Sequence, residues 1–413
     1  MNLRIMRTAQ IGLLVVVFGL VLPAVFLEGA FRIFAPTYPG IYQSDSMTLF
    51  GLVPGGRATF VHSRVNGGQR VSFHINAGGF RGPELRPSAT GTRIAVYGDS
   101  FIEGEFSPEP ETYVRQLETA LQSQRTDSVE VVNAGAHGFG PDQEFARMRR
   151  EIELLRPALI VWAIFADNDL SALVRNRMYR LTADSNLAPT HAVLSAGIRE
   201  YLDKRAHPRG LRMLHVVRWL DAKLEQKNSS FGQGMGILRP GEQWPTISQY
   251  IAWSFDRSNR EYRDFVADPN DTVRTIFGDH YDADVAATPD EPSSRYKLAA
   301  MDKLFALARD TLAARGVRVL VLVIPSPIDA CASYDIRVDS LQFPRYDRRR
   351  ISGEFETMAR RQQLPVLNLW APFSAAGACA LYFRDGNTHW NAAGQALAAR
   401  VTADTLRGLG WIR

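Results

Sequence analysis

The chain has 413 residues, enough for one large domain with insertions or for two domains. Hydrophobic residues make up 46% and charged residues 22% of the chain, as in an ordinary globular protein. The formal net charge is +5, and the Lys and Arg residues are scattered rather than gathered in one patch. This distribution argues against a nucleic-acid-binding protein.

The N-terminal segment is strongly apolar. An uncharged run, followed by further apolar residues beyond Glu28, predicts a transmembrane anchor over residues 11–34, since roughly 20 residues cross a bilayer as a helix. A cleaved signal peptide is the alternative, but the candidate cleavage site at Glu28 has a carboxylate where a small residue belongs. Because Arg4 and Arg7 precede the span, we expect residues 1–10 in the cytoplasm. The rest of the chain is then periplasmic, and the protein a single-pass inner-membrane protein.

The chain has two cysteines, Cys331 and Cys379. In an oxidising compartment two thiols of one folded domain can pair, and the alternative is two small buried hydrophobic side chains. Neither cysteine has neighbours typical of a metal or redox site. The sequence therefore favours a disulfide and predicts neither a metal nor a cofactor.

Residues 35–92 are rich in Pro, Gly and short β-like pieces, which predicts an extended lead-in that packs on the main domain. From residue 93 short β-branched runs alternate with helical periodicity. The expected elements are a strand over 94–97, a helix over 112–122, a strand over 129–133, a helix over 142–155 and a strand over 158–165. Such alternation predicts a parallel sheet with helices on both faces.

The alternation stops after residue 169 and resumes near residue 295, which is too long an interruption for a connection in a compact domain. We therefore interpret residues 170–294 as an inserted, mainly helical subdomain that could act as a lid. Its acidic part lacks the pattern of a calcium loop, so we expect a solvated acidic loop. The carboxylates concerned are those of Asp268, Asp271, Asp279, Asp282 and Asp284.

The core pattern returns in residues 295–413. The expected elements are a helix over 295–315, a strand over 317–324, a helix over 351–361, a strand over 365–369 and a last helix that begins after Asn391. Together with residues 93–169 they give a three-layer α/β/α sandwich with a five-stranded parallel sheet, of flavodoxin-like type. Ligands of such sheets bind beyond the carboxyl ends of the strands.

Polar clusters follow four of these strands, at one edge of the predicted sheet. A serine hydroxyl needs an imidazole to take its proton and a carboxylate to orient that imidazole, and Ser100, His389 and Asp385 have these types. The tetrahedral intermediate of acyl transfer needs prearranged hydrogen-bond donors. The backbone N–H groups of Ser100 and Gly138 and the side-chain amide of Asn168 are suited to that role.

These clusters carry a family resemblance. Gly98-Asp99-Ser100, the Gly138 loop, Asn168-Asp169 and the His389 segment resemble the four blocks of the SGNH/GDSL hydrolases, in their usual order. The resemblance covers about residues 93–165 and 317–409. It implies that Ser100 is the nucleophile, His389 the base, and Gly138 and Asn168 oxyanion donors.

The anchor, the stretch 76–82 and the long insertion resemble more narrowly the bacterial members with a single membrane span. Two features depart from the family pattern. Three residues rather than two separate Asp385 from His389, so either Asp385 or a backbone carbonyl orients the imidazole. Asp167 stands where a Gly is usual, and this carboxylate could slow the chemistry, bind a cationic group or point away. His137 is either a wall of the pocket or a surface-loop residue.

The sequence thus predicts a membrane-anchored serine esterase that removes an acyl group, most simply acetyl, from a carbohydrate or glycoconjugate. Three alternatives remain. One is O-acyl transfer to a cell-envelope polysaccharide, which needs a membrane partner to supply the acyl group. The others are lipid ester hydrolysis, for which the anchor is suited, and a catalytically weak binding or assembly protein.

Overall fold

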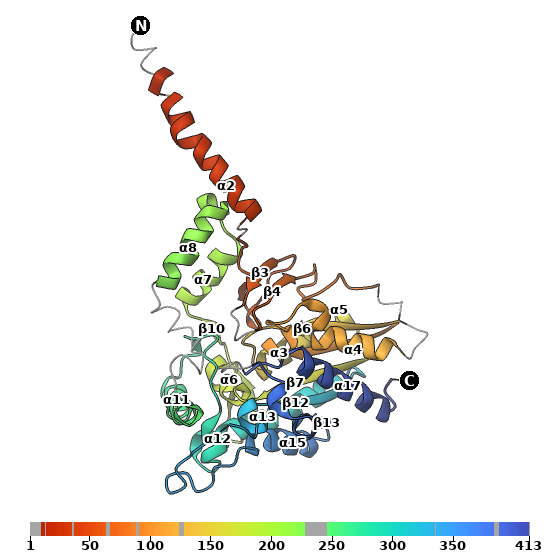
Figure 1. The fold of residues 1–413 in the computed structure, drawn as a ribbon. Coiled ribbons are helices and arrows are strands. Elements are labelled where there is room, and N and C mark those ends of the chain that lie inside the picture. Colours follow the sequence, from red (N-terminus) through yellow and green to blue (C-terminus); the bar gives the residue numbers. More distant parts are fainter. Residues whose placement is uncertain are drawn as a thin grey trace.

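Five parallel strands form the central sheet, in the order β6-β5-β7-β12-β13 (Figure 1). In chain order this is the 2-1-3-4-5 arrangement of flavodoxin-like sheets, whose ligand site lies where the order reverses, here between β5 and β7. The computed structural model describes residues 10–412 except 13, 35–36, 63–66, 88–90, 124–127, 228–245, 335 and 384–387. The strands are β5 (Thr92–Gly98), β6 (Val129–Gly135), β7 (Leu159–Ala166), β12 (Arg318–Pro325) and β13 (Val366–Asn368).

Helices cover both faces of the sheet, which confirms the predicted three-layer sandwich. Strand β7 is buried at every position and β12 at all but its first, because both are continuous apolar runs with a covered face on each side. Alternate strand residues pack into two separate apolar cores. One core includes α5 (Pro141–Leu155), α13 (Pro292–Ala313) and α15 (Arg350–Arg361), and the other includes α4 (Tyr113–Gln122), α16 (Trp370–Ala375) and α17 (Ala392–Gly408).

Two antiparallel hairpins precede the sheet: β1 (Tyr42–Asp45) with β2 (Leu49–Leu52), and β3 (Arg57–Val61) with β4 (Arg70–His74). The buried Arg81 follows them and donates hydrogen bonds to three backbone carbonyls, those of Glu103 and Gly104, each at 2.6 Å, and that of Ser107 at 2.8 Å. This part of the lead-in therefore packs on the core and fixes the loop that follows β5.

Between β7 and β12 the chain is mainly helical, with short two-stranded pairs. The helices include α6 (Asp169–Asn176), α7 (Ala196–Ala206), α8 (His215–Lys227), α11 (Ile247–Ala267) and α12 (Ala283–Ala287), and the short strands are β8 (Tyr179–Leu181), β9 (Leu187–Pro189), β10 (Val193–Leu194) and β11 (Thr272–Val273). Figure 1 shows α11 and α12 beside the sheet and α7 and α8 farther out, toward α2.

The expected solvated acidic loop is wrong. Asp282 and Asp284 are fully buried, and Lys297 of α13 places its Nζ 3.2 Å from Asp282 Oδ1 and 2.8 Å from Asp284 Oδ2. Asp279 pairs with Arg175 of α6 at 2.8 Å. Asp282 and Asp284 are buried because the Lys297 ammonium from a distant helix compensates their charge. The other three carboxylates are partly exposed and pair with arginines.

One helix near the N-terminus, Gln10–Phe34, is long and apolar enough to cross a membrane, as an anchor or as a signal segment would be. It includes α2 (Leu22–Phe34), and none of its most apolar stretch is buried against the rest of the protein. Residues 1–9, which we expect in the cytoplasm, lie outside the described part of the chain.

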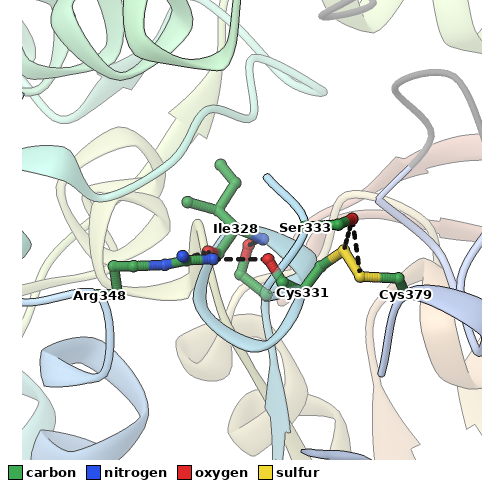
Figure 2. Close-up of a disulfide and its surroundings, with 6 residues drawn as sticks. Ile328, Cys331, Ser333, Arg348 and Cys379 are labelled. Carbon is green, nitrogen blue, oxygen red and sulfur yellow. Dashed lines mark hydrogen bonds between the residues drawn. A yellow bond between two sulfur atoms is a disulfide. The ribbon is translucent and has the colours of Figure 1, made fainter. Parts of the chain in front are cut away.

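A disulfide joins Cys331 and Cys379, with their Cα atoms 4.7 Å apart (Figure 2). Cys331 follows the short helix α14 (Pro327–Ala330) after β12, and Cys379 lies in the 3-10 helix η5 (Ala378–Ala380). Arg348 donates hydrogen bonds of 2.7 Å to the carbonyls of Ile328 and Cys331. The disulfide thus ties the loop after β12 to the segment that leads to His389.

Candidate active site

The hydroxyl of Ser100 meets the imidazole of His389 at the carboxyl end of β5. Ser100 begins the short helix α3 (Ser100–Glu103), and Asp99 caps this helix by accepting a 2.9 Å hydrogen bond from the N–H of Phe101. Ser100 Oγ lies 2.7 Å from His389 Nε2, although 289 residues separate them in the sequence. This hydroxyl and this imidazole therefore lie within the hydrogen-bond distance that a nucleophile and its base require.

Aromatic rings hold the imidazole of His389. Phe101 stacks on it with centroids 4.6 Å apart and planes 19° apart, and the ring of Phe106 lies 4.7 Å away. The carbonyl of His389 accepts a 2.9 Å hydrogen bond from the N–H of Phe383. Burial lowers the pKa of His389 to about 4, against the opposing charge of Glu105. The ring is therefore neutral at pH 7 and able to accept a proton.

Asp385 lies outside the described residues, so its role beside His389 stays a prediction.

A charged pair flanks the site, in the loop after β6. His137 Nδ1 lies 2.9 Å from Glu105 Oε2, and both side chains are about three-quarters buried. Burial alone would lower the pKa of His137, but the Glu105 carboxylate outweighs it and raises this pKa to about 10. Burial likewise opposes ionisation of Glu105, yet His137 lowers the pKa of Glu105 to about 2. The two groups form an ion pair near neutral pH.

Gly138 must be a glycine at this place. Its φ is +73°, and a Cβ built there would lie 2.4 Å from the ring of Phe277, a residue of the insertion. The same Phe277 ring lies 4.9 Å from that of His137. Gly138 therefore lets the loop after β6 turn tightly against the insertion.

Asn168 and Asp167 lie together after β7 but in different environments. Asn168 precedes α6, is partly exposed, and its side chain makes no hydrogen bond to any described residue. Asp167 is buried and accepts a 2.5 Å hydrogen bond from Ser326 at the end of β12. Burial raises the pKa of Asp167 to about 7. Of the alternatives for Asp167, this contact favours a carboxylate that is held by Ser326.

Three hydrogen-bond donors follow three adjacent strands. Strand β5 lies between β6 and β7, and Gly98 at its end pairs with Gly135 of β6. Ser100, Gly138 and Asn168 follow the ends of these strands by two or three residues. The backbone N–H groups of Ser100 and Gly138 and the amide of Asn168 donate to none of the described residues. The described part of the fold therefore leaves these three donors unused.

The sequence reasoning missed several residues around the pair. Glu105 comes five residues after Ser100, and its backbone carbonyl lies 3.1 Å from His62 Nε2. The His62 ring lies 4.8 Å from that of Phe106. No motif marks these residues, because the lead-in and the insertion bring His62 and Phe277 to the site through the fold alone.

Residues 281–412 match the family described as "SGNH hydrolase-like domain, acetyltransferase AlgX". No curated protein sequence matches the chain. Among solved structures, the lipase/acylhydrolase from Enterococcus faecalis is 12% identical, covers 77% of this chain and 96% of its own, with a TM-score of 0.32. The acetylxylan esterase Axe2 from Geobacillus stearothermophilus, solved as a catalytic mutant, is 12% identical, covers 78% and 97%, with a TM-score of 0.36.

Proposed function

We propose that this chain, an SGNH hydrolase of the ester hydrolase and acyltransferase type, acts on O-acyl esters of a carbohydrate or glycoconjugate. The reaction passes through an acyl-enzyme intermediate on Ser100. The observation that carries the proposal is the 2.7 Å distance between Ser100 Oγ and His389 Nε2. The acyl group is most simply acetyl, as the acetyltransferase in the family description suggests.

The first half-reaction acylates the serine. Ser100 Oγ attacks the acyl carbonyl carbon while its proton passes to His389 Nε2, which is neutral at pH 7 because burial lowers the pKa of this ring to about 4. The ester C–O bond then breaks, and the leaving sugar oxygen takes the proton from His389. Asp385 is proposed to orient the imidazole through Nδ1.

Charge on the former carbonyl oxygen needs donors that are in place before the reaction. We assign the backbone N–H groups of Ser100 and Gly138 and the amide of Asn168 to this oxyanion, since no described residue uses them. A donor of this kind typically contributes about 3 to 4 kcal/mol of transition-state stabilisation. His137, held by Glu105, is then a wall of the pocket beside Gly138.

The second half-reaction decides between two activities. In hydrolysis, water attacks the acyl carbon and gives a proton to His389. The bond between the acyl carbon and Ser100 Oγ then breaks, His389 returns the proton to Oγ, and a carboxylic acid is released. In transfer, a sugar hydroxyl replaces the water and becomes acylated. The family description favours transfer as the second candidate, and it would require a membrane partner that supplies the acyl group.

The N-terminal helix is proposed to anchor the enzyme in the inner membrane, with its catalytic part in the periplasm. Its length and apolar composition support this placement, and so does the disulfide, which is typical of oxidising compartments.

The direct test uses the full chain in detergent with p-nitrophenyl acetate. The wild type should release p-nitrophenol, and Ser100→Ala should abolish the release, whereas Ser340→Ala, at an exposed serine, should not. An acetyl group found on Ser100 after rapid quenching would identify the intermediate. Activity that survives Ser100→Ala contradicts the mechanism, and an inert wild type favours a binding protein.

A second experiment separates transfer from hydrolysis. Adding an oligosaccharide acceptor should produce acylated sugar at the expense of free acetate if the enzyme transfers its acyl group. Constant acetate release with no acylated sugar assigns hydrolysis.

A further inference from the structure

The 3-10 helix η4 (Gly210–Met213) and the start of α8 are attached to the end of α2. Glu28 of α2 accepts hydrogen bonds from the N–H groups of His215, at 3.0 Å, and Val216, at 3.1 Å, which begin α8. Thr37 donates its hydroxyl to the His215 carbonyl at 3.0 Å. Figure 1 shows α8 and α7 beside the end of α2, between that helix and the α/β layers.

This attachment presents apolar side chains to solvent. Leu211 is 74% exposed, Met213 62%, Leu220 48% and Trp219 38%. We call these four residues the η4–α8 corner. The Trp219 ring lies 5.4 Å from that of Phe31 in α2, so the apolar surface of the anchor helix continues onto the corner. Soluble surfaces rarely gather such large apolar side chains without an interaction partner.

Exposed cations surround the corner. Arg209 precedes η4, and an open groove of about 820 Å³ beside it is also lined by Arg199 of α7. Two other cations of the groove are in ion pairs, Arg212 with Asp221 at 3.0 Å and Lys204 with Glu200. Arg199 and Arg209 make no ion pair with any residue that the structure describes. Apolar and aromatic side chains flanked by cations are typical of helices that lie in the interface of anionic membranes.

The corner is attached to α2 at the height expected for a site in the membrane interface. The uncharged run over residues 11–27 is about 25 Å long as a helix, close to the thickness of the hydrocarbon layer. Glu28 then lies at the level of the headgroups, and its hydrogen bonds place the start of α8 at that level too.

We propose that the η4–α8 corner is a second membrane contact, which inserts its apolar side chains among the headgroups of the bilayer that holds α2, with anionic lipids beside Arg199 and Arg209. The proposal rests on the anchoring role of α2 in the proposed function.

The contact has a consequence for the active site. Asp203 of α7 accepts 2.9 Å and 2.8 Å hydrogen bonds from the backbone N–H and hydroxyl of Ser44 in β1. In the same strand the Tyr42 hydroxyl donates to Glu103 Oε1 at 2.6 Å, and Glu103 ends α3, which begins with Ser100. A membrane-bound corner would therefore hold the catalytic serine at a fixed height and tilt above the bilayer.

The test measures the depth of single fluorescent labels in the full chain, reconstituted in phosphatidylcholine vesicles that contain phosphatidylglycerol. Both native cysteines are joined, so one introduced thiol can be labelled with an environment-sensitive dye. Three variants are compared: Met213→Cys in the corner, Phe18→Cys in the anchor helix, and Leu341→Cys, whose native side chain is 93% exposed. Lipids with a nitroxide on the acyl chain report contact.

We expect the Met213 label to shift its emission to shorter wavelength and to be quenched, and the Leu341 label to do neither. Adding Arg209→Glu should weaken quenching at Met213, and so should removing phosphatidylglycerol, while the rate of p-nitrophenyl acetate hydrolysis in detergent stays unchanged.

The outcomes separate the corner from the anchor. If the label at position 18 is quenched and the label at position 213 behaves like the one at position 341, the corner does not contact the membrane, while the anchor does. A label at Phe18 that is not quenched overturns the anchor and, with it, the corner as a second contact. Equal quenching at Met213 with and without phosphatidylglycerol overturns the role of anionic lipid.

Discussion

Two histidines lie beside the same sheet edge in opposite protonation states. His389 is enclosed by Phe101 and Phe106 and faces the neutral hydroxyl of Ser100, so burial lowers the pKa of His389 to about 4. His137 is also largely buried, but its Nδ1 lies 2.9 Å from the Glu105 carboxylate, which raises the pKa of His137 to about 10. At His137 the Glu105 carboxylate outweighs burial, whereas at His389 burial has the larger influence on the pKa.

The difference in protonation suits the two rings to different roles. A neutral imidazole can accept the proton of a serine, whereas an imidazolium held by a carboxylate cannot. His389 is therefore suited to be the base, and His137 to shape and charge the pocket beside Gly138.

The largest expected effect separates the two histidines directly. His389→Gln should lower kcat/KM for p-nitrophenyl acetate by roughly 10⁴-fold or more, because Ser100 loses its proton acceptor. The matched variant His137→Gln should cost less than about 10-fold, because it leaves the Ser100–His389 pair intact. Equal losses would show that the rings do not differ in role.

The disulfide attaches the segment that leads to His389 covalently to the core, whereas no disulfide holds the loop of His137. Replacing both Cys331 and Cys379 by Ser should lower the free energy of unfolding by about 4 kcal/mol, for a cross-link that spans 48 residues. Urea unfolding of the double variant and of the dithiothreitol-reduced wild type should agree. Unchanged urea midpoints in both would contradict this role.

A substitution at Asn168 tests the proposed oxyanion donors while both histidines stay intact. Asn168→Ala should reduce kcat by roughly 10²- to 10³-fold, about 3 to 4 kcal/mol, with little change in KM. Since its side chain bonds to no described residue, urea unfolding should match that of the wild type. A loss in KM alone would assign Asn168 to substrate binding instead.

The smallest effect concerns stability and pH. The pKa of Glu105 is lowered from 4.5 to about 2, so its contribution is present above pH 4.5 and lost as the pH falls toward 2. The pKa of His137 is raised from 6.5 to about 10, so its contribution is full below pH 6.5 and lost as the pH rises through 10.

His137→Gln should therefore destabilise the protein most between pH 4.5 and 6.5, by about 1 kcal/mol for a pair that is a quarter exposed. Urea unfolding at a series of pH values measures this difference. A destabilisation that grows toward pH 10 would contradict the ion pair.

Local patterns in the sequence were sufficient for the five strands and most of the helices, although they did not predict α16. The continuous apolar runs of β7 and β12 predict buried strands, and the structure begins and ends both within one or two residues of the predicted bounds. Asn391 caps α17 as expected, by accepting hydrogen bonds from the N–H groups of Ala393 and Gly394. Apolar runs and helix caps depend only on residues close in the sequence, so the sequence is enough to predict them.

Long-range pairing could not be predicted in the same way. The sequence predicts a solvated loop at Asp282 and Asp284 because it does not show that Lys297 of α13 is their partner. Only the fold brings the three side chains together in a buried cluster. Phe277 reaches Gly138 from the insertion for the same reason. Neither contact leaves a spacing that a sequence pattern could reveal.

The sequence by itself determined the strands, the chemical types at their carboxyl ends and the apolar N-terminal helix, because each depends on residue type and local periodicity. The family resemblance paired Ser100 with His389, and the tertiary structure gave the 2.7 Å distance between them. Only the tertiary structure decided that Glu105 charges His137 and that Glu28 joins α2 to α8. The physical reason is that burial and charge pairing depend on distances between segments far apart in the chain, and those distances exist only once the sheet has formed.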